Sequence, residues 1–286
     1  MRSTGSPPPT PAASSASDSP RLGVMRQLAR HGLRPDTSLG QHFLLDENLV
    51  DVSVREAEIG PDDTVLEIGP GVGVLTVALA RKARTVHAVE VDRRLEPALT
   101  DVLADAEGVH LIFEDAVRLD VESLDPPPTR FVANLPYSIA TPVVVESTWR
   151  LPLVRRWSVM VQREVADRWL AAPGGRDYAA PSVMIQLATR PVARRAVPAT
   201  AFVPRPRVES ALVVLERTGP GVDPDVRRLV RAAFSGRRKT LANALAGAGY
   251  EKVEVTAALG RMGLGAAVRP EVLAPAEYVA LAEELG

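Results

Sequence analysis

The segment Glu67-Ile68-Gly69-Pro70-Gly71-Val72-Gly73 decides the fold of this chain. It continues a short apolar run, Thr64–Ile68, that has the composition of a buried strand, and it leads into a helical pattern over residues 73–82. Glycine permits a positive φ and removes the side-chain bulk that would keep a ligand away from the backbone. In open parallel sheets, ligands bind beyond the carboxyl ends of the strands. The segment therefore predicts a strand, a turn and a helix that together approach a nucleotide-like ligand.

Alternating strand and helix patterns continue along the chain after this turn. Further strands are predicted over residues 85–89, 109–113, 130–133, 157–161, 192–197 and 210–216. Helices are predicted over 21–31, 45–57, 95–103 and 163–170, and then, in an unbroken helical region, over 226–234, 239–246, 253–259 and 276–285. Strands that alternate with helices form a mainly parallel sheet with helices on both faces. We therefore expect a Rossmann-like α/β domain over 21–218, a small all-helical domain over 219–286 and a disordered tail over 1–20.

The composition excludes several classes of protein. The 286 residues include no cysteine, which excludes disulfides, thiolate nucleophiles and zinc ribbons. With 46% hydrophobic and 24% charged residues, the chain has the composition of a globular protein. No apolar run is long enough to cross a bilayer, and the first twenty residues lack the apolar core of a signal peptide. We therefore expect a cytoplasmic protein that makes no membrane contact.

The net charge of −1 hides an uneven distribution along the chain. Residues 36–149 carry 21 acidic and 8 basic side chains, whereas residues 150–209 carry 11 arginines and 4 acidic side chains. An acidic half beside an arginine-rich stretch indicates a polyanion that is bound by one face only. The alternative is a high arginine content spread over solvated faces.

Three glycines at alternate positions, Gly69, Gly71 and Gly73, are predicted to bind the cofactor. A nicotinamide dinucleotide would need the spacing G-x-G-x-x-G. Counted from Gly69, the third glycine position is Val74, and counted from Gly71 it is Thr76. The dinucleotide fingerprint is therefore absent.

Carboxylates follow the next two predicted strands. Glu90 ends the strand after the glycine turn, where it can accept hydrogen bonds from both ribose hydroxyls. Asp115 ends the third strand, where it can accept from an adenine amine. Either acid alone is typical of a solvated strand end, but their spacing behind a G-x-G-x-G turn indicates a nucleoside site. S-adenosylmethionine, which carries an adenosine and a sulfonium but no phosphate, fits this set better than a dinucleotide.

The segment Ala133-Asn134-Leu135-Pro136-Tyr137-Ser138 is predicted to hold the methyl acceptor. The Asn134 side-chain oxygen and a main-chain carbonyl around residues 135–136 can bind both hydrogens of an adenine N6 amine, which would localise the nitrogen lone pair. Tyr137 can stack on the base, a contact worth about 1–3 kcal/mol. The structural alternative is a proline turn with a buried tyrosine. Because the motif follows a matching cofactor site, we predict as catalytic residues Asn134, Leu135, Pro136 and Tyr137, and we expect no metal ion.

These motifs resemble those of the rRNA adenine N6-dimethyltransferase family, from about Leu39 to the C-terminus. Further matching motifs are Leu39-Gly40-Gln41-His42-Phe43-Leu44, Glu90-Val91-Asp92, Glu114-Asp115-Ala116, Ala201-Phe202-Val203-Pro204-Arg205-Pro206-Arg207-Val208-Glu209-Ser210 and Arg237-Arg238-Lys239-Thr240-Leu241. The resemblance implies a class I S-adenosylmethionine-dependent methyltransferase whose helical domain binds RNA. It also implies cofactor contacts from His42 (through its backbone), Leu44, Gly69, Glu90, Asp115 and Asn134.

The family has two branches. KsgA (RsmA) enzymes dimethylate two adjacent adenosines in the 3′-terminal hairpin of small-subunit rRNA, whereas Erm enzymes modify one adenosine of large-subunit rRNA and confer macrolide resistance. The segments 67–71 and 237–241 favour the KsgA branch. The chain departs from the residues usual in that branch at His42 and Ser138, which are both usually asparagine, and at Tyr178-Ala179-Ala180, usually Tyr-Gly-Arg. Ser138 bears on substrate choice or on the order of the two methylations.

The expected partner is rRNA in the small ribosomal subunit or its precursor, bound by a monomer. Phosphate contacts are predicted for Arg163, Arg205, Arg207, Arg237 and Arg238. Two other classes stay open at this stage. One is a non-catalytic assembly or transcription factor on the same fold, as in the mitochondrial transcription factor B relatives, and the other is a DNA adenine methyltransferase.

Overall fold

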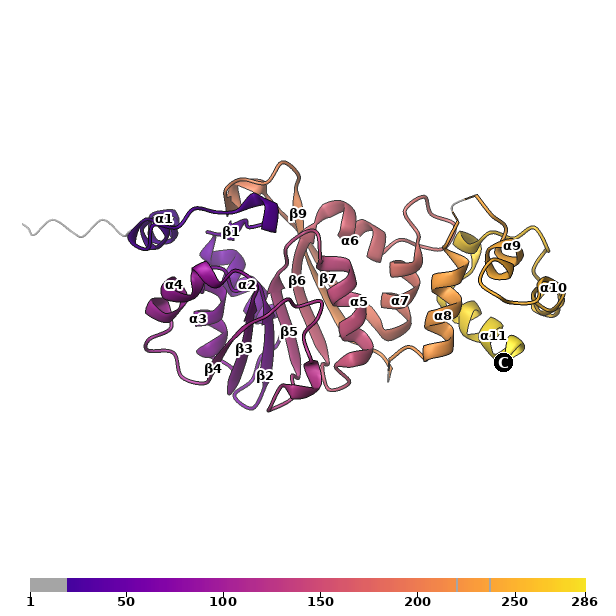
Figure 1. Ribbon diagram of the computed structural model, residues 1–286, viewed down its shortest axis with the longest axis horizontal. Helices are drawn as coiled ribbons and strands as arrows, with labels where there is room; N and C mark the ends of the chain where they lie inside the picture. The colour runs from indigo at the N-terminus through magenta and orange to yellow at the C-terminus, as the bar shows by residue number, and fades with distance from the viewer. Residues whose placement is uncertain (1–19, 220, 237) are drawn as a thin grey trace, which may run out of the picture.

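The computed structural model describes residues 20–219, 221–236 and 238–286, so the predicted tail lies almost entirely outside the described residues. In this part of the chain, seven strands form one mixed sheet in the order β4-β3-β2-β5-β6-β9-β7 (Figure 1). Their bounds are β2 Thr64–Ile68, β3 Thr85–Glu90, β4 Val109–Phe113, β5 Arg130–Asn134, β6 Arg156–Gln162, β7 Thr189–Val197 and β9 Ser210–Arg217. A short second sheet pairs β1 (Phe43–Leu44) with β8 (Phe202–Val203).

Helices cover both faces of the large sheet (Figure 1). The helices α2 (Glu47–Glu56) and α3 (Val74–Ala80) pack on one face, and α5 (Ala140–Arg150) and α7 (Ala180–Ala188) pack on the other. Successive residues of a strand point to opposite faces, and Val65 and Leu66 in β2 accordingly belong to different hydrophobic clusters. The remaining helices of this part are α1 (Pro20–Arg30), α4 (Glu96–Val102) and α6 (Arg163–Trp169).

The strand order reverses beside β2. From β2 the chain proceeds outward to β3 and β4, and it then returns to β5 on the other side of β2. Both neighbours run parallel to β2. Such a reversal leaves a crevice beyond the carboxyl ends of the strands, which is where ligands bind in open α/β sheets. The glycine turn that follows β2 lies at this crevice.

The C-terminal helices share a hydrophobic core with the sheet layer. They are α8 (Pro224–Ala233), α9 (Leu241–Ala246), α10 (Lys252–Arg261) and α11 (Pro275–Leu285). Leu229 and Tyr278 from these helices belong to the same buried cluster as Trp157 of β6 and Trp169 of α6. A hydrogen bond from the Tyr178 hydroxyl to the Leu273 carbonyl, 3.0 Å long, crosses the same boundary. The helical part is therefore packed against the sheet layer rather than tethered to it.

The predicted fold class is confirmed, with two differences in detail. The strand β9 runs antiparallel to both of its neighbours, β6 and β7, because a loop without a crossover α-helix connects β7 to β9. The strand β7, which follows α6 and α7, keeps the direction of β6. The helices α5 and α7 were not predicted. The run Val143-Val144-Val145 in α5 is β-branched and has low helix propensity, and it is burial against the sheet that stabilises this helix. None of the described helices is long and apolar enough to cross a membrane.

Candidate functional site

The glycine turn after β2 has the backbone conformation that requires glycine. The φ angles of Gly69, Gly71 and Gly73 are +73°, +61° and +84°, all in the left-handed region. The Gly69 N–H donates to the Val89 carbonyl at 2.9 Å, which ties the turn to the end of β3. A Cβ atom on Gly71 would lie 2.8 Å from the ring of Phe43. Both the conformation and the space at this turn therefore exclude a side chain at Gly71.

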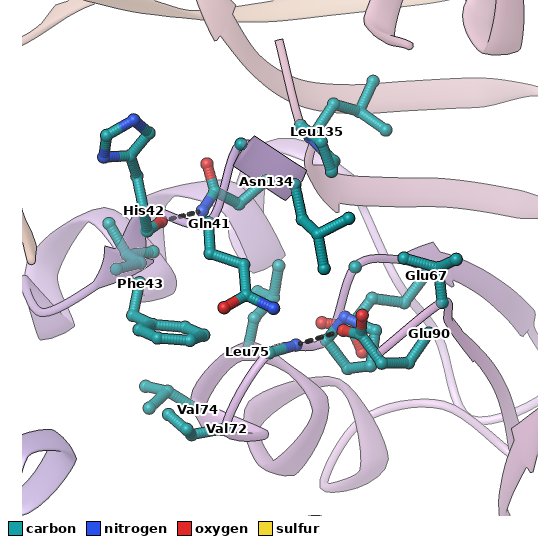
Figure 2. Close-up of a pocket in the computed structure, with 18 of the residues that line it drawn as sticks. Gln41, His42, Phe43, Glu67, Val72, Val74, Leu75, Glu90, Asn134 and Leu135 are labelled. Carbon is teal, nitrogen blue, oxygen red and sulfur yellow. Dashed lines mark hydrogen bonds between the residues drawn. The ribbon is translucent and has the colours of Figure 1, made fainter. Parts of the chain in front are cut away.

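A cavity opens over this turn at the carboxyl ends of β2, β3 and β5, and its free space together with the solvent at its mouth is about 710 Å³ (Figure 2). Its wall includes residues 39–44, Glu67, residues 69–72, Glu90 and residues 134–137. A second open cavity shares Gly69, Glu90 and Pro136 with the first and extends to Asp115 and Ser138. The two cavities are thus adjacent, and together they bring every predicted site residue except Gly73 to one edge of the sheet.

Glu90 is buried beside the glycine turn. Its two carboxyl oxygens accept the N–H groups of Gly71, at 3.2 Å, and Asp92, at 3.0 Å. Burial raises the pKa of Glu90 even though these hydrogen bonds favour its charged form. Each oxygen keeps a second lone pair, so the carboxylate can accept further hydrogen bonds from ligand hydroxyls.

Glu67, the last acidic residue before the turn, is fully buried at the cavity wall. Burial raises its pKa to about 8, and the nearby carboxylate of Glu90 adds to the rise. Its Oε2 atom has no hydrogen-bond partner among the described residues. At neutral pH the site therefore contains one carboxyl that is mostly protonated. No role for Glu67 was predicted from the sequence, although its position two residues before the first glycine of the turn is a usable signal.

The side chain of Asn134 at the end of β5 is held in one orientation. Its Nδ2 donates to the His42 carbonyl at 2.9 Å, as Figure 2 shows. Because a carbonyl can only accept, the atom of the Asn134 carboxamide that faces the His42 carbonyl must be the nitrogen. The Oδ1 atom is therefore left to accept hydrogen bonds from a ligand. The next residue, Leu135, is anchored by its N–H to the Met160 carbonyl of β6 at 3.1 Å. The carboxamide is thus fixed from two sides of the cavity.

Tyr137 lies at the same edge with its hydroxyl engaged. The hydroxyl is 2.7 Å from Ser210 Oγ at the start of β9. Burial raises the pKa of Tyr137, so the phenol stays neutral at physiological pH. Its ring lies against the ring of His42, with centroids 5.5 Å apart and planes 28° apart. One face of the tyrosine ring is therefore already covered by protein.

The segment 41–44 lines the cavity together with the carboxyl ends of the strands. Leu44 is buried in β1, and Gln41 Nε2 donates to Asp92 Oδ2 at 2.8 Å. Asp92 in turn binds Arg94, and this hydrogen bond is the main cause that lowers the pKa of Asp92. Sequence reasoning missed Gln41 and Asp92 as supports of the site, because their contact joins residues 51 positions apart.

Two predicted cofactor residues, Asp115 and Gly73, do not line the first cavity. Asp115 borders only the second cavity; its side chain is 47% exposed, and its Oδ1 accepts the Val117 N–H at 2.9 Å. Gly73 borders neither cavity: a Cβ there would meet Val102 and Leu99 of α4 at 3.2–3.3 Å. Gly73 thus allows α3 and α4 to pack closely, and a cofactor contact for it stays a prediction.

The predicted RNA-contacting arginines have different surroundings. Arg205 and Arg207 are exposed on the loop between β8 and β9, and Arg238 is exposed before α9. Arg163 forms an ion pair with Glu209. Arg237 lies outside the described residues. Among the residues that the structure describes, no group of three or more His, Cys, Asp or Glu could hold a metal ion.

Comparison with known proteins gives consistent matches along the chain. A family model described as "Ribosomal RNA adenine dimethylase" matches residues 32–285. The "Ribosomal RNA small subunit methyltransferase A" of Moorella thermoacetica is 42% identical over 269 residues, which cover 89% of this chain and 93% of that protein. The protein of the same name from Rubrobacter xylanophilus is 45% identical over 250 residues, with 87% and 94% covered.

Solved structures share the fold over both parts of the chain. A dimethyladenosine transferase from Plasmodium falciparum matches with a TM-score of 0.72 at 23% identity, covering 84% of this chain and 96% of that one. The 23S rRNA methyltransferase ErmE matches with a TM-score of 0.63 at 28% identity, covering 85% and 99%. At 23% identity, the match to the Plasmodium falciparum protein shows a similar fold and nothing more.

Replacing Gly71 by alanine is expected to weaken binding of S-adenosylmethionine by at least about tenfold. The left-handed conformation costs a residue with a Cβ about 1–2 kcal/mol, and the new methyl group would press on the Phe43 ring that lines the cavity. Calorimetric titration measures the affinity. Gly23→Ala is the matched control, because a Cβ there meets nothing within 4 Å. Equal affinity of the Gly71 and Gly23 variants would contradict the close-approach argument.

Replacing Glu67 by glutamine is expected to flatten the pH dependence of stability. With its pKa raised from 4.5 to about 8, folded Glu67 holds a proton that the unfolded chain releases. The wild type therefore loses stability from this group as the pH rises from 4.5 to about 8. Urea unfolding at pH 5 and pH 8 should show a smaller loss in Glu67→Gln than in the wild type or the exposed control Glu107→Gln. The same loss in all three proteins would exclude a buried neutral Glu67.

Proposed function

We propose, from the premise that this chain belongs to the ribosomal RNA adenine dimethylase family, that it dimethylates N6 of two adjacent adenosines in the 3′-terminal hairpin of small-subunit (16S) rRNA during ribosome biogenesis. The chain is an rRNA adenine dimethyltransferase that uses S-adenosylmethionine. Its alignment with small-subunit enzymes over about 90% of its length supports the KsgA branch. The observation that carries the chemistry is the fixed Asn134 carboxamide at the cavity edge. We propose that the enzyme acts as a cytoplasmic monomer and needs no metal ion.

The two adjacent cavities fit the proposed donor. Glu90 would accept from the ribose hydroxyls, Asp115 from the adenine amine, and the backbone around Gly69 and Gly71 would border the nucleoside. Leu44 and the His42 backbone would enclose the methionine end. When bound there, S-adenosylmethionine supplies an electrophilic methyl group on a positively charged sulfur.

Asn134 and its neighbour would hold the amine that receives the methyl group. The Asn134 Oδ1 acceptor binds one amine hydrogen, and a main-chain carbonyl binds the other, so that the nitrogen lone pair is no longer shared with the ring. The Pro136 carbonyl already accepts the Ile139 N–H at 3.2 Å, which favours the Leu135 carbonyl as the second acceptor. Acceptors preorganised in this way stabilise the transition state and orient the nitrogen for in-line attack. The proton can leave after methyl transfer, so no general base is required.

Tyr137 would hold the base that is turned out of the RNA. Base–aromatic stacking is worth about 1–3 kcal/mol, and the Ser210 contact prevents the ring from rotating away. A base in a hairpin loop costs less to extrude than a paired one. The exposed Arg205 and Arg207 stand on the loop that ends at Ser210, where they can bind the phosphates beside the target base.

Two alternatives predict different outcomes in one experiment. An Erm-type enzyme would methylate large-subunit rRNA, and a non-catalytic assembly or transcription factor would methylate nothing. The experiment is mass mapping of methylated adenosines after incubation with small-subunit particles, large-subunit rRNA and duplex DNA. Two adjacent dimethyladenosines in small-subunit rRNA alone is the expected result. Preferential methylation of large-subunit rRNA or duplex DNA would overturn the proposal, as would the absence of methylation on all three substrates.

Replacing Asn134 by alanine is expected to lower turnover by about 10²–10³, by analogy with the loss of one transition-state hydrogen bond. Turnover is measured as methyl transfer to small-subunit particles at saturating donor. Asn48→Ala is the matched control, because Asn48 is exposed on α2 and remote from the cavity lining. Turnover of the Asn134 variant within about twofold of this control, a change below ~0.5 kcal/mol, would refute the assigned role.

Replacing both Arg205 and Arg207 by alanine is expected to reduce the salt dependence of RNA binding. Each phosphate contact that is lost lowers the slope of log K against log salt by about 1, so the double variant should lose about 2. Binding is measured between low and high salt on the hairpin RNA. Arg163→Ala is the comparison, because Glu209 already neutralises that guanidinium, and its slope should change less. An unchanged slope in the double variant would remove this loop from the RNA interface.

A further inference from the structure

The imidazole of His42 makes two contacts that its predicted backbone role does not require. Its Nδ1 lies 2.7 Å from the Pro204 carbonyl oxygen. Because that oxygen can only accept, Nδ1 carries the proton and donates it. The same ring packs against Tyr137 with a centroid distance of 5.5 Å. The His42 side chain therefore joins the cavity segment to two further parts of the site, and in Figure 2 its ring points away from Glu67 and Glu90.

The residue bonded to the imidazole begins the arginine-bearing loop 204–209. This loop carries the exposed Arg205 and Arg207. At its far end the Arg163 N–H donates to the Glu209 carbonyl at 2.9 Å, and Ser210 contacts the Tyr137 hydroxyl. The near end has no comparable side-chain anchor in the described residues other than His42, whose neighbour Phe43 pairs with Val203 across β1 and β8.

The tyrosine ring is likewise held from two sides. Its hydroxyl is fixed by Ser210, and one of its faces is fixed by His42. A centroid distance of 5.5 Å leaves no space for a base between the two rings, because two stacking gaps of about 3.5 Å each would separate the rings by about 7 Å. The target base must therefore stack on the face of Tyr137 that is turned away from His42. The contact with His42 then fixes the orientation of the ring on which the base stacks.

We propose that the His42 imidazole is a positioning residue for the target adenosine, in which the ring fixes the stacking plane of Tyr137 and Nδ1 fixes the arginine-bearing loop 204–209. This inference rests on the proposed function, since it assigns a role within the same RNA site. The two contacts act on different steps. The plane of Tyr137 governs how the amine approaches the methyl group, which affects kcat. The position of the loop governs the contacts of Arg205 and Arg207 with the RNA phosphates, which affects KM for RNA.

Two substitutions separate these contacts. His42→Asn keeps a donor near the Nδ1 position but removes the ring, whereas His42→Phe keeps a ring but removes the donor. An aromatic pair and a net hydrogen bond each contribute free energies that correspond to about three- to tenfold in a rate or binding constant. We expect His42→Asn to lower kcat by about this factor with little change in KM for RNA, and His42→Phe to raise KM with little change in kcat. His42→Ala should show both effects.

The experiment measures kcat and KM for methylation of small-subunit particles, together with the calorimetric Kd for S-adenosylmethionine and the melting temperature. His110→Ala is the matched control, because His110 is an exposed histidine on β4. The backbone carbonyl of His42 is retained in every variant, so donor affinity should stay at the control value, and the melting temperature should fall by no more than a few degrees. Wild-type kcat and KM in all three His42 variants would overturn the proposal, as would a parallel loss of donor affinity, which marks a merely structural role. If the wild type methylates no adenosine, the proposed function itself fails, a result that is distinct from either outcome.

Discussion

The parallel pairing of β2 with β3 on one side and β5 on the other is the constraint on which the site depends. It places the carboxyl ends of three strands at one edge of the sheet. Gly69 comes directly after β2, and Glu90 and Asn134 are the last residues of β3 and β5. Because the backbone ladder fixes these ends, the groups that face the cavity need only short side chains or none. The segment 41–44 then reaches the same edge through the β1–β8 pair, and the bond between Asn134 and the His42 carbonyl closes the cavity.

The charge distribution along the chain agrees with the separation of the proposed donor site from the proposed RNA-contacting loop. The acidic stretch over 36–149 contributes the buried carboxyls Glu67 and Glu90, whose pKa values are both raised by burial. With Glu67 mostly protonated, Glu90 is the lining carboxyl that can face a positively charged donor, and the lining contains no lysine or arginine that would bind a phosphate. The arginine-rich stretch over 150–209 instead contributes the exposed Arg205 and Arg207. The proposed donor site and the proposed RNA-contacting loop thus differ in charge.

Six of the seven strands of the large sheet could be predicted from sequence to within one residue at each end, most readily β2 and β3, which are apolar runs buried on both faces. The strand β7 begins three residues before its predicted start, because most of its residues are exposed. The glycine turn was predictable for a similar reason, since its residue types are dictated by backbone conformation. Strand direction was not predictable at β9, where the same apolar run suits either direction. The roles of Gln41 and of the His42 imidazole depend on partners 51 and 162 positions away, and no local pattern records such contacts. The protonation of Glu67 likewise follows from burial, which only the folded chain defines.

The helix α5 connects the base site to the C-terminal helices. It begins at Ala140, just after the Asn134–Ser138 segment, and near its end Trp149 lies under the guanidinium groups of Arg227, at 4.5 Å, and Arg231, at 5.8 Å, from α8. Cation–π contacts of this kind add to the shared hydrophobic core. The spacing between Tyr137 and the predicted RNA-binding helices is therefore set by one helix that is anchored at both ends.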